Sequence, residues 1–137
     1  MTEQMRWLAI VLTSVVVVLS VTACSSAKAS KCEEAFTAAA TSVSGVASAE
    51  WDCNFSFGGG WVRSQVVVEA ATKAEAIAVM EAVLRAIAAA PDLKDSWSTP
   101  QEYANQNRTV VVAANALGFG AVPTVGQVRA HYGITPR

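Results

Sequence analysis

The feature that most constrains how this chain folds is an apolar run without any charge near its start. The run covers residues 7–23, WLAIVLTSVVVVLSVTA, and it follows MTEQMR, in which Arg6 is the one basic residue. It is close to the lower limit of about 17 residues for a membrane-spanning helix, but it ends in small residues, as an export signal does. We therefore expect residues 1–23 to be a signal peptide. An uncleaved transmembrane helix over the same run is the alternative.

The end of the run carries a more specific motif. Cys24 is directly preceded by an aliphatic residue and two small residues, Val21, Thr22 and Ala23. This pattern resembles the lipobox of bacterial lipoproteins. The resemblance implies cleavage before Cys24, a thioether-linked diacylglycerol on Cys24, and acylation of the new amino terminus, for example with palmitate. Several acyl chains hold a protein on a membrane stably, since each buried CH₂ contributes about 0.8 kcal/mol. We thus expect attachment to the cell membrane, facing the extracytoplasmic side.

The composition excludes two broad classes of protein. Hydrophobic residues make up 53% of the chain, and 10 Lys and Arg stand against 11 Asp and Glu, for a net charge of −1. Such a chain is too apolar to be disordered and too balanced in charge to bind nucleic acid by electrostatics. Residues 24–31, rich in serine, alanine and lysine, are expected to form a short, flexible, lipidated tether. Residues 32–137 are expected to form a single domain.

Two of the three cysteines remain once Cys24 is assigned to the lipid anchor. Cys32 and Cys53 form an even pair in a chain expected outside the cytoplasm, where disulfides persist. A bridge between them would close a loop of about twenty residues and stabilise the fold by roughly 3 kcal/mol on the chain-entropy model. Metal binding is the competing use, but two thiols without nearby histidines fall short of a zinc site. We therefore expect a Cys32–Cys53 disulfide.

The first half of the domain shows clear periodicity. Ser30 and Glu33 form an S-x-x-E capping box, which predicts a helix that starts at Cys32. Glu33 and Glu34 are then interpreted as favourable negative charges at a helix N-terminus. Apolar and polar residues alternate over residues 50–57, and residues 61–69 resume a strand after three glycines that suit a hairpin turn.

A second helix is expected next. Thr72 and Glu75 form another capping box, and Pro91 ends the pattern. One face of this helix carries a stripe of large apolar residues, namely Ile77, Met80, Leu84 and Ile87. We expect that stripe to cover the inner face of the hairpin.

The second half of the domain gives weaker signals. Trp97 suggests a short strand, and residues 108–113 form a clear strand pattern after the polar stretch 99–107. Thr124 begins a capping box, which predicts a short helix that ends at Gly133. The predicted order is a helix followed by two ββα units, which hints at an internal duplication. The expected fold is α+β, with a four-stranded antiparallel sheet and helices packed on one face, resembling permuted ferredoxin-like folds. The layout and the Ala/Val-rich composition also resemble small actinobacterial lipoproteins of unknown function.

Catalytic motifs are missing from the sequence. His131 is the only histidine, on a short terminal helix, and no serine lies in a G-x-S-x-G motif. We interpret His131 as a surface or half-buried structural residue, and we expect no cofactor and no metal. Trp61, directly after the glycine turn, and Phe119, in a loop, are the candidate ligand contacts, since an exposed aromatic ring can stack on a sugar or pack on a protein.

The sequence therefore favours a membrane-anchored binding or structural accessory module of the cell envelope. Its expected partners are the membrane, through the lipid anchor, and another envelope protein or a cell-wall component, but no nucleic acid. The alternative is a small, hydrolase-like envelope enzyme whose site assembles across the fold from Glu50, Asp52 and His131. That alternative requires the last helix to pack beside the first strand.

Overall fold

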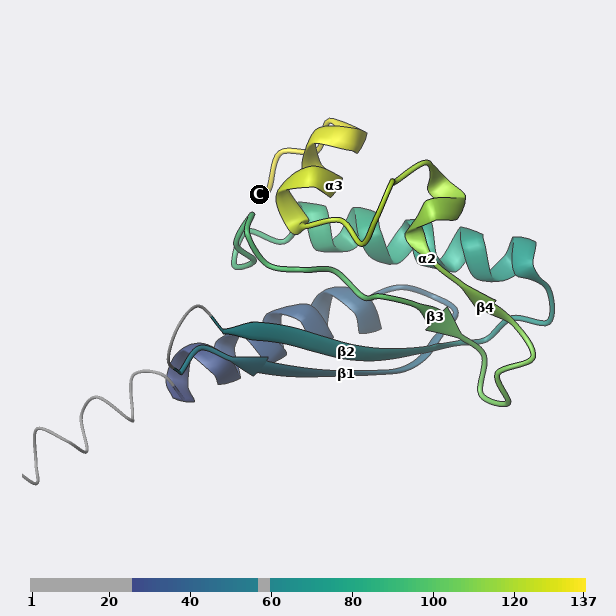
Figure 1. The fold of residues 1–137 in the computed structure, drawn as a ribbon, viewed down its shortest axis with the longest axis horizontal. Helices are drawn as coiled ribbons and strands as arrows, with labels where there is room; N and C mark the ends of the chain where they lie inside the picture. The colour runs from purple at the N-terminus through teal and green to yellow at the C-terminus, as the bar shows by residue number, and fades with distance from the viewer. Residues whose placement is uncertain (1–25, 57–59) are drawn as a thin grey trace, which may run out of the picture.

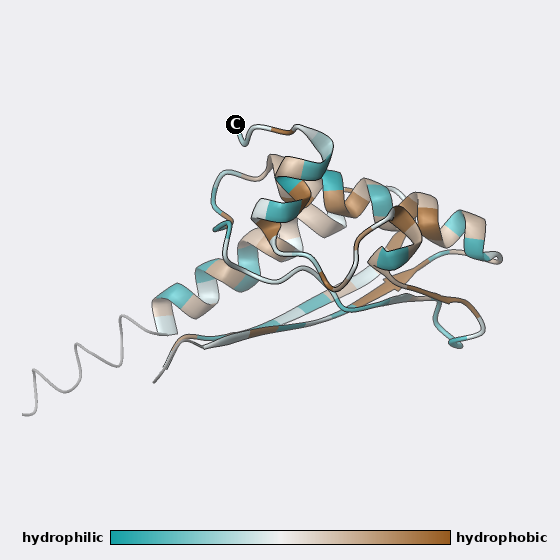
Figure 2. Cartoon of the chain, turned by 45° about the horizontal axis from the view of Figure 1, so that its top comes forward, coloured by the Kyte–Doolittle hydropathy of each residue, from teal (hydrophilic) through white to brown (hydrophobic). Residues whose placement is uncertain are grey.

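The computed structural model describes residues 26–56 and 60–137, which form a sheet with helices on one side (Figures 1 and 2). The expected signal peptide, Cys24 and most of the glycine turn lie outside the described residues. A helix covers residues 26–41. It is followed by β1 (Val46–Asn54), β2 (Trp61–Val68), α2 (Lys73–Ala89), β3 (Tyr103–Ala104), β4 (Val111–Val112), the 3₁₀ helix η1 (Ala114–Leu117) and α3 (Val125–Tyr132). The α+β class and the four-stranded sheet are as expected.

The strand order is β1-β2-β3-β4, and the sheet is mixed. β1 and β2 form a long antiparallel hairpin, and β3 and β4 are also antiparallel, but β2 and β3 are parallel. The expectation of a fully antiparallel sheet is therefore wrong at one pair. The cause is α2, which carries the chain back along the sheet between β2 and β3, so that β3 runs in the same direction as β2.

The third strand lies where the sequence predicted a polar connection. β3 is Tyr103–Ala104, inside the stretch 99–107, whereas Trp97 is not in a strand. The ring of Trp97 instead packs on Phe55, with ring centroids 5.4 Å apart. The strand expected over residues 108–113 shortens to β4, two residues long. Strands this short show no alternation in the sequence, because tertiary contacts rather than local pattern define them.

The N-terminal helix begins earlier than expected. Residues 26–31 are already helical, so Ser30 lies inside the helix and the predicted capping box there is wrong. The same residues are therefore not the flexible tether that their composition suggested. Alanine and lysine are good helix formers and serine costs little, so the helix extends towards the N-terminus beyond Ser30. None of the helices in the described ranges is long and apolar enough to cross a bilayer.

The other two helices have the expected caps. The hydroxyl of Thr72 accepts a hydrogen bond from the backbone N–H of Glu75 at 3.2 Å, and α2 ends just before Pro91. The Glu75 carboxylate accepts from the N–H of Ala71 instead of Thr72, so only half of the predicted capping box forms. At α3, Thr124 and Gln127 exchange both capping-box hydrogen bonds, and Gly133 ends the helix with φ of +62°. These caps are local, which is why the sequence alone predicts them.

The core lies between the inner face of the sheet and the helices. The expected disulfide is present: Cys32 and Cys53, with Cα atoms 6.3 Å apart, join the N-terminal helix to β1. Beside it, Phe36 stacks on Trp51 with nearly parallel rings 5.1 Å apart. Helix α2 contributes six buried residues, Ala76, Met80, Val83, Leu84, Ile87 and Ala88. Ile77, expected on the same stripe, is only partly buried.

Candidate functional site

The two aromatic residues proposed as ligand contacts lie on different parts of the fold. Trp61 starts β2 with 38% of its surface exposed, and the Arg63 guanidinium lies 4.3 Å from its ring centroid. Phe119 is half-buried beside α3, where it packs on His131 with ring centroids 4.4 Å apart. Trp61 belongs to the hairpin and Phe119 to the helical layer, so the structure does not combine them into one site. Their roles as ligand contacts stay predictions.

The residues of the alternative enzyme site do not come together either. Glu50 and Asp52 are exposed on β1, whereas His131 is exposed on α3, which packs against α2 instead of β1. The condition for that site, the last helix beside the first strand, is therefore not met. Among residues 26–56 and 60–137, no cluster of three or more His, Cys, Asp or Glu side chains is placed to hold a metal ion.

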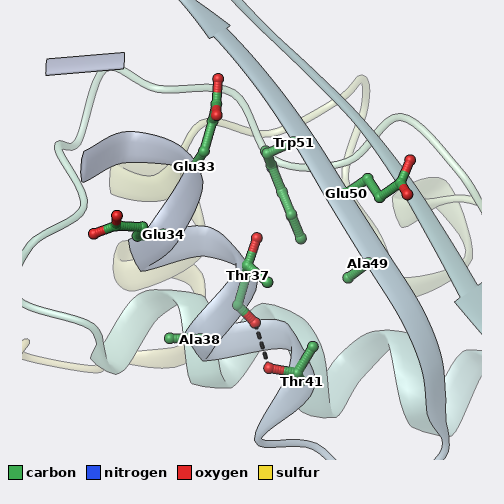
Figure 3. Close-up of a pocket in the computed structure, with 8 residues that line it drawn as sticks. All are labelled: Glu33, Glu34, Thr37, Ala38, Thr41, Ala49, Glu50 and Trp51. Carbon is green, nitrogen blue, oxygen red and sulfur yellow. Dashed lines mark hydrogen bonds between the residues drawn. The ribbon is translucent and has the colours of Figure 1, made fainter. Parts of the chain in front are cut away.

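The structure instead shows a groove that sequence reasoning missed (Figure 3). It lies between the N-terminal helix and β1 and has a volume of about 620 Å³. This size falls within the range of about 300–1,000 Å³ for small-ligand sites. Eight residues line it: Glu33, Glu34, Thr37, Ala38 and Thr41 from the helix, and Ala49, Glu50 and Trp51 from β1.

The groove runs along the free edge of the sheet. β1 is the first strand in the sheet order, and within residues 26–56 and 60–137 it pairs only with β2. The backbone N–H of Cys53 donates to Glu33 Oε1 at 3.2 Å, so it points away from β2 and towards the helix. In an antiparallel pair, backbone groups alternate in direction every residue. The N–H and C=O groups of Trp51 and Ala49 therefore point the same way, into the groove.

The floor of the groove is rigid and aromatic. Trp51 is only 8% exposed, and its indole is held by stacking on Phe36. In Figure 3, Trp51 lies between the helix and the strand. The buried indole Nε1 has no hydrogen-bond partner in the described part of the chain.

The rim of the groove is acidic. Glu33 and Glu34 come from the helix and Glu50 from the strand, and the eight lining residues include no Lys, Arg or His. In Figure 3, Glu34 points away from β1, and Glu50 points away from the helix, on the opposite face of β1 from Trp51. The interpretation of Glu33 and Glu34 as N-terminal helix charges is wrong, because the helix already starts by residue 26. Glu33 instead covers one end of the β1 edge through its hydrogen bond to Cys53. The groove thus offers a ligand negative charge and backbone groups that have no partner in the described part of the chain.

Two tyrosine hydroxyls are also buried without partners in the described residues, those of Tyr103 and Tyr132. Burial raises the pKa of Tyr103 far above its ordinary value, and the nearby Tyr132 raises it further. The pKa of Tyr132 is raised by burial and by Glu81, against the opposing effect of Arg85. Tyr103 lies in the core with no exposed surface, so it is structural and not part of the groove.

Comparison with known proteins adds no further assignment to this geometry. No protein-family model matches the chain, and no curated protein or solved structure matches it. The candidate site is therefore defined by the groove itself: an open strand edge, an aromatic floor and three carboxylates.

Proposed function

We propose that this chain is a lipid-anchored, extracytoplasmic binding module that holds its ligand in the groove between the N-terminal helix and β1. The observation that carries the proposal is the β1 edge, which has no strand partner among the described residues and whose Ala49 and Trp51 backbone groups, by alternation from Cys53, face the groove. Exposed strand edges are a liability that proteins usually cover or blunt. An edge left open beside a formed groove is consistent with a surface kept for a ligand.

The anchoring part of the proposal rests on the sequence. The lipobox-like pattern that ends in Cys24 supports lipidation, and the Cys32–Cys53 disulfide supports an oxidising, extracytoplasmic compartment. Because the helix is already formed at residue 26, a lipid on Cys24 would keep the domain near the bilayer. Glu33 lies seven residues after Ser26, a rise of roughly 10 Å along the helix. The ligand would then be something found at the membrane surface.

Binding, rather than catalysis, is the function that the groove supports. Its polar side chains are three carboxylates and the hydroxyls of Thr37 and Thr41. The Thr41 hydroxyl donates to the backbone carbonyl of Thr37 at 2.6 Å, and Glu33 is engaged by Cys53. A nucleophile needs a base within hydrogen-bond reach to be activated. The groove lining has no histidine or lysine, and in the described residues neither threonine hydroxyl donates a hydrogen bond to one of the carboxylates.

The anchor is tested by the intact mass of the protein extracted from bacterial membranes without reductant, for the native chain and for Cys24→Ser. We expect the native protein to lack residues 1–23, to carry added acyl mass, and to be two hydrogens lighter than its reduced form. We expect Cys24→Ser to keep the unprocessed mass. An unprocessed mass for both proteins would show that the first segment is a transmembrane helix.

The groove is tested by site-specific photo-crosslinking in intact cells. A photoreactive residue at Thr41, in the groove, should give a discrete cross-linked product. The same residue at Lys73, an exposed position at the start of α2, is the matched control and should not give that product. Identical products from both positions, or none from Thr41, would remove the groove as the binding site.

A further inference from the structure

We propose that the ligand of this groove is an extended peptide segment rich in Lys or Arg, which pairs with β1 as an added strand. This inference rests on the proposed function and names the chemistry of its partner. Peptide recognition by strand addition takes its affinity from main-chain hydrogen bonds along a sheet edge and its specificity from pockets for alternate side chains. The β1 groove has both features.

The main-chain part of the recognition comes from Ala49 and Trp51. Each presents one N–H and one C=O to the groove, because the groups of the intervening Glu50 face Gln65 of β2. Beyond Trp51, the Cys53 N–H is already bound by the Glu33 carboxylate. Before Ala49, the pairing of β1 with β2 is irregular between Val46 and Ser48. The available ladder is therefore short and has two defined ends.

The side-chain part comes from the helix. An added strand would lie between β1 and the helix face that carries Thr37, Ala38 and Thr41. Ala38 and Ala49 are small, so they leave room for the peptide backbone, and the Trp51 indole forms the floor. Alternate peptide side chains would point to this floor, and those between them would point away from it.

Charge decides what kind of segment fits. Glu33 and Glu34 border the groove on the helix, and Glu50 lies on the outer face of β1, beside the place where the outward-pointing side chains of an added strand would lie. No cation is among the lining residues, so a basic segment is complementary. A second copy of this chain is the other natural occupant of an open edge. Pairing β1 with β1 would bring two sets of these carboxylates together, and like charges in close opposition destabilise a sheet pair. The groove therefore favours a basic partner over self-association.

The test uses the protein as extracted from membranes, in detergent, and a short synthetic peptide that alternates valine and lysine. We expect this peptide to bind and to slow amide hydrogen exchange at Ala49 and Trp51, while a valine–glutamate peptide of equal length does not bind. A third peptide carries N-methyl groups on the residues whose N–H would face β1. Its affinity should fall by about tenfold or more, because each N-methyl group removes one hydrogen bond.

Two variants test the two halves of the proposal. Ala49→Pro deletes an edge N–H that β2 does not use, and proline is tolerated at such a position of an edge strand. We expect it to weaken peptide binding while near-ultraviolet circular dichroism stays unchanged. Glu34→Gln/Glu50→Gln should weaken binding roughly threefold to tenfold at low salt. Its matched control is Glu81→Gln/Asp92→Asn, which removes two carboxylates that do not line the groove and should leave binding unchanged.

Each contrary result has a definite meaning. Equal binding of the N-methylated peptide, or unchanged exchange at Ala49 and Trp51, overturns strand addition. Protection of these amides that rises with protein concentration and not with peptide identifies a second copy as the occupant and overturns the basic partner. If no peptide binds but Thr41 still cross-links in cells, the peptide proposal fails and the proposed function stands. If the Thr41 cross-link is also absent, both fail.

Discussion

The two halves of this domain are stabilised in different ways. Residues 26–90 form long elements with regular periodicity, and a disulfide joins the first helix to the first strand. Residues 91–137 contain two strands of two residues each and short helices, tied together by side chains that bind backbone groups far along the chain. In the first half, pattern determines structure. In the second half, apart from the local caps of α3, specific long-range hydrogen bonds contribute more.

The largest expected effect is loss of the disulfide. Cys32→Ser/Cys53→Ser should lower the free energy of unfolding by about 3 kcal/mol, because the unfolded chain regains the entropy of a loop of 21 residues. Urea denaturation of the variant measures this. Native protein with reductant is the control and should match the variant. A loss of less than about 1 kcal/mol would mean that periodic packing, rather than the bridge, stabilises the first half.

In the second half, Arg129 connects two helices, as the disulfide connects the first helix to β1 in the first half. From α3, its guanidinium donates to the carbonyls of Ala88 (2.9 Å) and Ala90 (2.6 Å) and pairs with Asp95. It thereby satisfies carbonyls at the C-terminal end of α2 that the helix itself leaves unpaired. Arg129→Met should cost about 2 kcal/mol, since buried hydrogen bonds to a charged group are worth more than neutral ones. Thermal unfolding of the variant checks this value.

The control for Arg129 is Arg85→Met on α2. Arg85 pairs with Glu81 one turn away and half of its side chain is exposed. An exposed pair of this kind contributes about 0.3–0.5 kcal/mol. The contact of the Arg85 guanidinium with the Tyr132 ring, 4.1 Å from the ring centroid, adds about 0.5–1 kcal/mol, so Arg85→Met should still cost less than Arg129→Met. If Arg85→Met and Arg129→Met destabilise the protein equally, the contrast between pattern and specific bonds does not hold for the helices.

A smaller effect is expected at Asn105, which organises the turn between β3 and β4. Its side chain donates to the Ala70 carbonyl at 3.1 Å and accepts from the Val110 N–H at 3.0 Å. Asn105→Ala should cost about 1 kcal/mol, because one carbonyl and one N–H lose their partners. Hydrogen exchange of the backbone amides should become faster in β3 and β4 and stay unchanged in β1. Equally faster exchange in all four strands would show that the two halves unfold as one unit.

Tyr103→Phe has the smallest effect at neutral pH. The buried hydroxyl has no partner in the described residues, so its removal should change stability by less than about 0.5 kcal/mol at pH 7. Burial raises the folded-state pKa above the ordinary 10.0. The free energy of unfolding of the native chain therefore keeps its full value below pH 10. It falls progressively as the pH rises from 10 towards the folded-state pKa of Tyr103, because the unfolded chain loses this proton first. The free energy of unfolding, measured from pH 8 to 12, should fall less steeply in Tyr103→Phe than in the native chain. Equal slopes would contradict a raised pKa for Tyr103.

Sequence reasoning succeeded where one element contains the whole signal. The capping residues Thr72 and Thr124 and the alternation that buries Trp51 and Cys53 depend on neighbours in the same element. It failed at β3, because Tyr103–Ala104 is a strand only through its pairing with β2 and β4. It also failed at Ser30, which was predicted to cap the helix, because the helix already begins by residue 26.

The candidate groove shows the same division. Glu33 and Glu34 are visible in the sequence, but their closeness to the β1 edge is not. The only local hint is that Glu33, Thr37 and Thr41 recur at helical spacing beside the buried stripe of Cys32, Phe36 and Ala40. That pattern alone is typical of a solvated helix face.

By itself, the sequence determined the disulfide partners, two helix caps and the inward face of the hairpin, because these depend on local periodicity and on a count of cysteines. The tertiary structure alone decided the sheet order, the parallel β2–β3 pair, and which strand edge stays open. The physical reason is that strand pairing joins residues far apart in the chain, so its outcome depends on how all helices cover the sheet. The β1 groove exists only because that arrangement leaves the first strand at the edge beside an acidic helix face.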